Sequence, residues 1–246
     1  MVTAAAWNES DWEAWNAERE QFAKGPQGPA ALTGTFWITA TSEDEGQEVP
    51  GLPGRWWVAS TSVVGSELPA LQPGEFIEVA PGVSATALVR QAKFALRVFD
   101  PATTKPLAEQ GIATFAPQEK WVVPAQVERD SEVLDVTTVD GATIPTEFYG
   151  WVNFELEGTP QRLRVTNTGS ELHAVFGDTS AENGVHPFRF LSIPLPDTEG
   201  NTVIDFNYSY LSPSAFNKNY LCPTPVADNK LNIAVEAGEQ HAVFAS

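Results

Sequence analysis

The sequence predicts a mainly β protein, either an antiparallel β-sandwich or a partly closed β-barrel, with one N-terminal α-helix. From Leu32 onward, short runs of β-branched and aromatic residues alternate with Gly, Pro, Asp and Asn, which is the pattern of an all-β chain. Helices do not alternate with these runs, so nothing would cover the faces of a parallel sheet. The absence of a repeat of fixed period argues against a propeller or a solenoid.

The N-terminal helix is expected over residues 11–24. The run from Ser10 to Glu13 is a capping-box pattern, in which the serine caps the helix and the glutamate reaches back to its amide. The Gly-Pro pair at 25–26 should end the helix. Three aromatic residues fall on one face and should pack on a sheet: Trp12, Trp15 and Phe22.

The strand pattern is clearest in nine segments. They are 33–40, 55–63, 94–99, 133–138, 148–156, 162–166, 172–176, 202–207 and 231–236. Glycines at 141 and 158 fit hairpin turns, whereas the acidic, Pro- and Gly-rich stretch 41–54 is expected to be a mobile surface loop. Since composition does not shift sharply anywhere, we expect one domain over 1–246, with a characteristic C-terminal motif over 205–239.

Composition excludes several classes of function. The formal charge is −18, from 14 Lys and Arg against 32 Asp and Glu, and such a field repels nucleic acid and anionic membranes. One cysteine excludes an intramolecular disulfide and a thiolate zinc cage. The first fifteen residues lack the pattern of a secretory signal, and no segment has the ~20 apolar residues of a membrane span. We therefore expect a soluble, cytoplasmic protein.

The C-terminal motif is the most distinctive part of the chain. It combines short polar residues, prolines and a late Gly-Glu pair, in the runs 205–210, 213–217, 222–225, 229–231 and 236–239. This order resembles the closing segment of a bacterial and archaeal family known as domain of unknown function 1684. Weaker likenesses extend over nearly the whole chain: 15–37, 51–56, 96–101, 121–123 and the Phe-x-Asp-Thr-Ser run 176–180. The resemblance implies a family and no chemistry.

The chain departs from the family pattern at two places. Where the family carries a glycine-rich Thr-Tyr-Gly-Gly-Gly-Arg-Tyr-like stretch, this chain has 184–190, in which Arg189 is the residue clearly retained. Many members also have a second cysteine where this chain has Ser214. A role that depends on the glycine turn or on a cysteine pair therefore cannot be carried over to this chain.

A set of polar residues near the C-terminus admits two interpretations. Asn and Asp side chains satisfy backbone groups in irregular, proline-rich segments, so the set could pin a cover over one end of the β-structure. The same groups could instead line a ligand pocket, with Arg189 gripping an anion and a carboxylate acting as acid or base. The set is Asp178, Arg189, Asp205, Asn207, Asn217, Cys222, Asn229 and Glu239.

Other candidate sites are weaker. Cys222 lies between Leu221 and Pro223, which favours a packing role over a reactive thiol, although a Cys-His nucleophile stays open. The three histidines lack metal-ligand spacing, and nucleotide-binding motifs are absent, so we expect no metal and no cofactor. Trp57 should point away from Trp56 on a strand; it could form a stacking platform beside Arg55 or be covered by the N-terminal helix.

Two functions remain after these exclusions. The first is a scaffold without catalysis that binds a small molecule or a protein partner. The second is a hydrolase-like enzyme whose acid-base group is Asp178, Asp205 or Glu239, in a pocket with Arg189 or Cys222. A deep pocket containing a carboxylate of perturbed pKa would favour the enzyme, whereas saturated hydrogen bonds and a flat apolar patch would favour the scaffold.

Overall fold

The computed structural model describes residues 8–246, which form two compact units. Unit 1 comprises the described residues up to Glu20 together with Gln110–Val243, and unit 2 comprises Gln21–Glu109 and Phe244–Ser246. A two-stranded sheet pairs β7 (Leu107–Thr114) with β15 (Glu239–Phe244). The expected single domain stays a prediction, because compactness does not show whether either unit folds alone.

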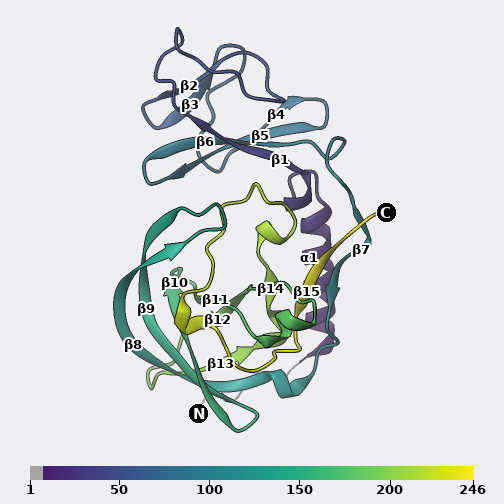
Figure 1. Cartoon of the computed structure of the whole chain (residues 1–246), viewed down its shortest axis with the longest axis vertical. Helices are drawn as coiled ribbons and strands as arrows, with labels where there is room; N and C mark the ends of the chain where they lie inside the picture. The colour runs from purple at the N-terminus through teal and green to yellow at the C-terminus, as the bar shows by residue number, and fades with distance from the viewer. Residues whose placement is uncertain (1–7) are drawn as a thin grey trace. The chain divides into compact units, whose positions relative to one another are not determined.

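Unit 1 is built on a seven-stranded antiparallel sheet (Figure 1). The strand order is β13-β8-β9-β10-β11-β12-β14. The strands are β8 (Val122–Thr137), β9 (Thr143–Leu156), β10 (Thr159–Asn167), β11 (Glu171–Phe176), β12 (Arg189–Pro194), β13 (Asn201–Asp205) and β14 (Tyr210–Leu211). The sheet curls until β13 meets β12, where Thr202 Oγ1 donates to Pro194 O at 2.8 Å, but no ladder closes it within the described residues.

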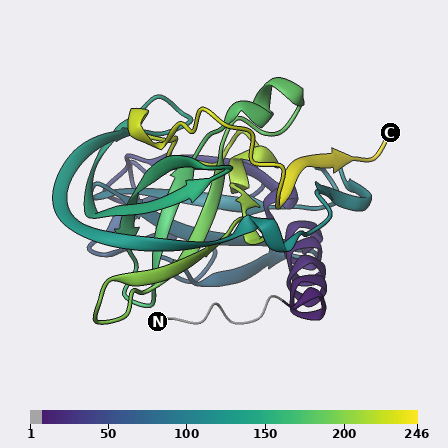
Figure 2. The ribbon, with the colours of Figure 1, turned by 90° about the horizontal axis from the view of Figure 1, so that it is seen from below.

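The two longest strands of unit 1 are strongly curved (Figures 1 and 2). Their register shifts between Arg129 and Glu132, which is a β-bulge, and a bulge bends a strand. Gly150 lies opposite the bulge, where an added Cβ would stand 2.1 Å from Glu128 O. Glycine is therefore required at this position for the backbones to approach so closely.

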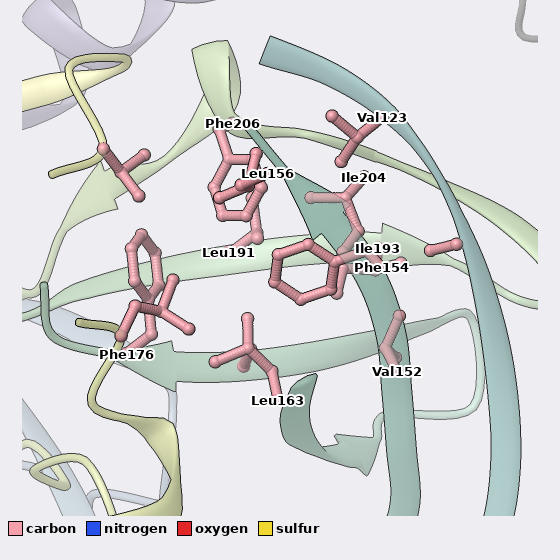
Figure 3. Close-up of a cluster of buried hydrophobic side chains, with 14 of the residues drawn as sticks. Val123, Val152, Phe154, Leu156, Leu163, Phe176, Leu191, Ile193, Ile204 and Phe206 are labelled. Carbon is pink, nitrogen blue, oxygen red and sulfur yellow. The ribbon is translucent and has the colours of Figure 1, made fainter. Parts of the chain in front are cut away.

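The main hydrophobic core lies on the inner face of this sheet (Figure 3). Alternation is plain in β11, where Leu172, Ala174 and Phe176 are buried in the core while His173 and Val175 point to the other face. The ring of Phe206 is central, with tilted or edge contacts to the rings of Trp121, Phe154 and Phe176. Burying such side chains contributes ~1.5–3 kcal/mol each.

The helix α1 (Glu9–Lys24) begins two residues earlier than predicted. Asn8 Oδ1 accepts a hydrogen bond from Ser10 N at 3.0 Å, so the expected cap at Ser10 is wrong and the asparagine fills that place. Trp12 and Trp15 are half-buried in unit 1, as their face predicts. Phe22 is 52% exposed, so its predicted packing is wrong.

Unit 2 contains a four-stranded antiparallel sheet and a short hairpin. The sheet order is β1 (Leu32–Ile38), β6 (Lys93–Phe99), β5 (Val83–Arg90) and β4 (Phe76–Ala80). The hairpin joins β2 (Trp56–Ala59) to β3 (Ser62–Gly65). The single strand predicted over 55–63 is wrong, because the chain reverses where Ser60 adopts a φ of 59°. The indole of Trp56 is fully buried in the core of this unit.

Short 3-10 helices punctuate both units. They are η1 (Pro29–Ala31), η2 (Glu119–Trp121), η3 (Thr179–Asn183), η4 (Phe206–Tyr208), η5 (Pro213–Ala215) and η6 (Ala227–Asn229). The predicted strand over 231–236 is wrong: this stretch is irregular, and Leu231 N donates to Gly177 O. Both hairpin turns are confirmed, with Gly141 and Gly158 at positive φ. The mainly β fold class with one N-terminal α-helix is also confirmed.

Candidate functional site

The candidate Arg189 is engaged in a buried network. Its side chain is fully buried, and Nη2 bonds Asp178 Oδ2 at 2.6 Å and Val235 O at 2.8 Å. Nη1 donates to the carbonyls of Ala237 and Glu239, which leaves Nε without a partner. Burial lowers the pKa of Arg189 and the charge of Asp178 raises it, yet a guanidinium stays protonated. Asp178 also accepts from two backbone amides, Ser180 N and Val235 N.

Glu239 forms the second buried ion pair of unit 1. Its carboxylate is fully buried and holds Arg19 of α1 bidentately, at 2.6 Å to Nε and 3.0 Å to Nη2. It also accepts from Leu211 N at 2.6 Å. The preceding Gly238 has a φ of +72°, and a Cβ there would lie 2.4 Å from Ser209 O. The Gly-Glu pair of the C-terminal motif therefore ties the helix to β14.

Asn207 joins its neighbours to the loop before β8. The buried carboxamide exchanges two 3.0 Å hydrogen bonds with the backbone of Gln118, and its Nδ2 also donates to Asp205 Oδ1 at 2.8 Å. Trp12 Nε1 donates to Asn207 O at 3.0 Å. The irregular backbone that the Asp205–Asn207 pair fixes is therefore the loop at Gln118, and not the proline-rich segment 213–225.

Asn229 cross-links two strands in the same way. Its Oδ1 accepts from Arg164 N at 2.7 Å, and its Nδ2 donates to Arg164 O and Val175 O, both at 2.9 Å. Asn217 accepts from Asn219 N at 2.9 Å in a local turn. Cys222 is buried, and its carbonyl accepts from Val139 N. The side chain of Asn229 thus joins η6 to β10 and β11, and that of Asn217 stabilises a local turn.

The candidates therefore do not converge on one pocket. Neither Arg189 nor Cys222 lines any of the cavities described in residues 8–246, and Trp57, half-buried on β2, does not either. Asp205 is the exception among the carboxylates. It lies on the wall of a groove of about 810 Å³ in unit 1.

This groove, called the acidic groove below, combines carboxylates with aromatic side chains. It lies beside β12 and β13 and the loop that joins them. Its lining residues are Trp15, Val122, Ser170, Glu171, Ser192, Pro194, Leu195, Pro196, Asp197, Asn201, Thr202, Val203, Asp205, Tyr208 and Tyr210. None of these is basic. Arg19 contacts the Tyr210 ring at 5.0 Å, but its charge is paired with Glu239.

The three carboxylates of the acidic groove differ in their environments. Burial raises the pKa of Asp205, against the lowering effect of hydrogen bonds from Asn207. Hydrogen bonds from Asn201 lower the pKa of Asp197. Glu171 Oε1 accepts from Ser192 Oγ at 2.7 Å. Glu171 Oε2 and Asp205 Oδ2 have no hydrogen-bond partner among the described residues. Neither oxygen is fully buried, so both can contact a ligand.

The aromatic residues of the acidic groove are held in defined orientations. Trp15 and Tyr208 make an edge contact, with ring centroids 5.0 Å apart. Phe190 holds Tyr210 in a second edge contact, at 5.7 Å. Burial raises the pKa of both tyrosines, and the charge of Asp205 raises that of Tyr208 further. Both phenols are therefore neutral hydrogen-bonding groups at pH 7.

Sequence reasoning missed most of the acidic groove. Of its polar residues only Asp205 was a candidate; Glu171, Asp197, Tyr208 and Tyr210 were not. One signal was available: Glu171 and His173 alternate with buried apolar residues, which places them on the outer face of a strand. Which outer positions share a groove depends on the pairing of β11 with β12, and no local pattern encodes it.

Within residues 8–246, no group of three or more His, Cys, Asp and Glu side chains is placed to hold a metal ion. No helix in the same range is long and apolar enough to span a bilayer.

Comparisons with known proteins identify the family. A family model described as "Protein of unknown function (DUF1684)" matches residues 109–240, which leaves out the stretches before 109 that seemed similar in sequence. A search of curated proteins found no match. The solution NMR structure of an uncharacterised protein of Haloarcula marismortui is similar at 26% identity and a TM-score of 0.44, over 53% of this chain and 76% of that chain. Because the family model covers more than half of the chain, the protein belongs to the DUF1684 family of unknown function.

Proposed function

We propose that this protein binds a small organic cation in the acidic groove, without catalysing a reaction. The observation that carries the proposal is the composition of the groove: three carboxylates and three aromatic rings, with no basic side chain among the described residues that line it. The expected ligand carries an ammonium or similar group on an apolar body. The acidic groove has a volume of about 810 Å³, which suits a metabolite-sized molecule.

Electrostatics supports a cationic ligand. The whole chain carries a formal charge of −18, so a cation is drawn toward it and an anion is repelled. Inside the acidic groove, Glu171 Oε2 and Asp205 Oδ2 can each accept a charge-assisted hydrogen bond, which is about twice as strong as a neutral one. A bound ammonium group would also lower the raised pKa of Asp205 toward its ordinary value, because an opposite charge favours the carboxylate.

The aromatic rings support an organic cation over a metal ion. An ammonium group over a tyrosine or tryptophan face gains about 0.5–2 kcal/mol from the ring quadrupole. Trp15, Tyr208 and Tyr210 all line the acidic groove, and their packing partners keep the rings in place. A hard metal ion would gain little from these rings.

The enzyme alternative has one observation in its favour, the raised pKa of Asp205 in a groove. The enzyme hypothesis places Arg189 beside the acid-base carboxylate, but Arg189 is bonded to Asp178 and to backbone carbonyls instead of to Asp205. A protein partner is less favoured for unit 1, where the exposed large apolar side chains among the described residues are Val133 and Val139 on the β8–β9 hairpin and Leu195 after β12, too few for a continuous apolar patch. The cytoplasmic location stays a prediction, supported by the single cysteine.

A charge series of matched probes tests the proposal. The probes are 4-fluorobenzylamine, 1-ethyl-4-fluorobenzene and 4-fluorobenzoate, and fluorine NMR of each measures binding to the full chain. We expect affinity to fall in that order. Asp205→Asn should weaken binding of the amine about tenfold, a loss of about 1.4 kcal/mol.

Glu155→Gln is the matched control. It removes the same charge from an exposed position on β9 outside the acidic groove, and so should leave binding unchanged. Equal effects of the two substitutions would show that the amine feels the net charge alone, and the proposed site would then be wrong. Equal binding of all three probes would refute the cationic ligand class.

A further inference from the structure

A second cavity lies apart from the acidic groove and shares no residue with it. This cavity, called the threonine pocket below, has a volume of about 220 Å³ and lies between β8, β9, β10 and β11 and the C-terminal segment. Its lining residues are Val136, Thr138, Ile144, Thr146, Phe148, Thr166, His173, Val175, Leu221, Pro223, Thr224, Val226 and Asn229. None of these carries a formal charge at pH 7.

The hydroxyl groups of the threonine pocket have their protons committed to the protein. Thr146 Oγ1 donates to Ile144 O at 3.2 Å, and Thr224 Oγ1 donates to Thr137 O at 2.9 Å. Thr138 and Thr166 have acceptors in the same way. A hydroxyl oxygen that has donated its proton can still accept. These four groups therefore offer acceptors to a ligand, and few donors.

The imidazole of His173 is the polar side chain in this pocket without a hydrogen bond among the described residues. Its ring contacts that of Phe190 edge-on, with centroids 5.1 Å apart, and its backbone carbonyl is what Thr166 binds. Asn229, by contrast, uses its whole carboxamide on Arg164 and Val175. A neutral imidazole offers one donor and one acceptor. The histidine is thus the group placed to recognise one polar atom of a ligand.

The C-terminal motif builds one wall of the threonine pocket. Leu221, Pro223 and Val226 supply its apolar surface. The wall is held against the β8–β9 hairpin by two backbone bonds, Thr224 N to Thr137 O and Val139 N to Cys222 O, both at 2.9 Å. The structural hydrogen bonds of the motif therefore also define the shape of a cavity.

We infer that the threonine pocket binds a small uncharged molecule that has an apolar ring and one hydroxyl group. The walls are apolar, so an ion would lose its hydration without gaining a counter-charge. Cavities of about 150 Å³ with apolar walls accept a benzene-sized molecule, and about 220 Å³ leaves room for a substituent. The hydroxyl would donate to a threonine oxygen or to His173 and accept from the imidazole N–H.

Binding of 4-fluorophenol, followed by fluorine NMR, tests this inference. Fluorobenzene has the same ring without the hydroxyl, and 4-fluorobenzoate carries a charge. We expect saturable binding of 4-fluorophenol, at least about tenfold weaker binding of fluorobenzene because a hydrogen bond is lost, and no binding of the benzoate.

Two variants and one control locate the site. Val226→Phe should fill the threonine pocket and abolish binding of the phenol, whereas Val133→Phe adds the same ring at an exposed position outside it and should change nothing. His173→Phe keeps an aromatic contact with Phe190 and should narrow the difference in affinity between 4-fluorophenol and fluorobenzene, because the imidazole donor is lost while the threonine acceptors remain. A thermal melt of each variant verifies folding.

Three results would overturn the inference: no saturable binding of 4-fluorophenol to the wild type, unchanged binding to a folded Val226→Phe, or unchanged discrimination between phenol and fluorobenzene in His173→Phe. Because the threonine pocket and the acidic groove share no residue, Asp205→Asn should leave phenol binding intact. Failure of one proposal is therefore distinguishable from failure of the other.

Discussion

Two sets of polar residues in unit 1 differ in whether the protein itself satisfies their hydrogen-bonding groups. In the buried set, nearly every hydrogen-bonding side-chain atom is bonded to another group of the protein. The members of this set are Asp178, Arg189, Asn207, Asn229 and Glu239. In the acidic groove, Glu171 and Asp205 each keep one carboxylate oxygen without a partner among residues 8–246. The difference teaches that residue type alone does not separate structural from binding roles. What separates them is whether the group has been satisfied internally.

The largest expected effect comes from breaking the buried ion pair. Arg189→Met should lower the free energy of unfolding by about 3–5 kcal/mol, because Asp178 would keep a buried charge without its partner. Urea denaturation followed by tryptophan fluorescence measures this loss. The double variant Arg189→Met with Asp178→Asn should recover part of it. A loss below about 1 kcal/mol for the single variant would place Arg189 outside the stabilising set.

A smaller effect is expected from the strand cross-link at Asn229. Asn229→Ala removes the hydrogen-bond partner of Arg164 N, Arg164 O and Val175 O. Each of these groups that stays buried without water should lower the free energy of unfolding by about 1–3 kcal/mol. Asn217→Ala is the matched control, because Asn217 lies in a less buried local turn and should cost less. Equal losses of unfolding free energy for the two variants would contradict this ranking.

The pH dependence of stability should expose the two partly buried histidines. Burial lowers the pKa of His173 and of His186, so the unfolded chain binds more protons than the folded chain just below pH 6.5. Unfolding free energy should therefore fall as the pH drops from about 7 through 6.5, until the lowered pKa values are passed. Glu171 opposes the effect at His173, and Arg189 adds to it at His186.

Denaturation curves between pH 5 and pH 8 measure this slope. The double variant His173→Phe with His186→Gln should flatten it, whatever its stability at pH 7. An unchanged slope in the double variant would show that other groups carry the pH dependence.

The smallest expected effect on stability belongs to the acidic groove. Asp205→Asn keeps an oxygen that can accept hydrogen bonds from Asn207. It also removes a partly buried carboxylate, whose charged form burial disfavours, as the raised pKa of Asp205 indicates. Its unfolding free energy at pH 7 should match or slightly exceed that of the wild type. Asp205→Ala removes the acceptor and should cost about 1–3 kcal/mol. If Asp205→Asn costs as much as the alanine variant, the charge itself stabilises the fold.

The sequence by itself determined the class of fold, the helix and the family. Alternating apolar residues are a local signal, and Gly141 and Gly158 mark their turns because positive φ favours glycine. The strand predicted over 231–236 failed because its apolar residues are buried by tertiary contacts without a ladder. The single strand predicted over 55–63 failed because nothing in the local sequence marks the reversal at Ser60.

Only the tertiary structure decided which polar residues meet. The partners Arg19 and Glu239 are 220 positions apart, and Gln118 and Asn207 are 89 apart, so no local pattern could pair them. The sequence singled out Asp205, Asn207, Arg189 and Asn229 as candidates but could not say which would be hydrogen-bonded within the protein. That depends on strand register and on the curl of the seven-stranded sheet, which bring distant outer-face residues together into a groove.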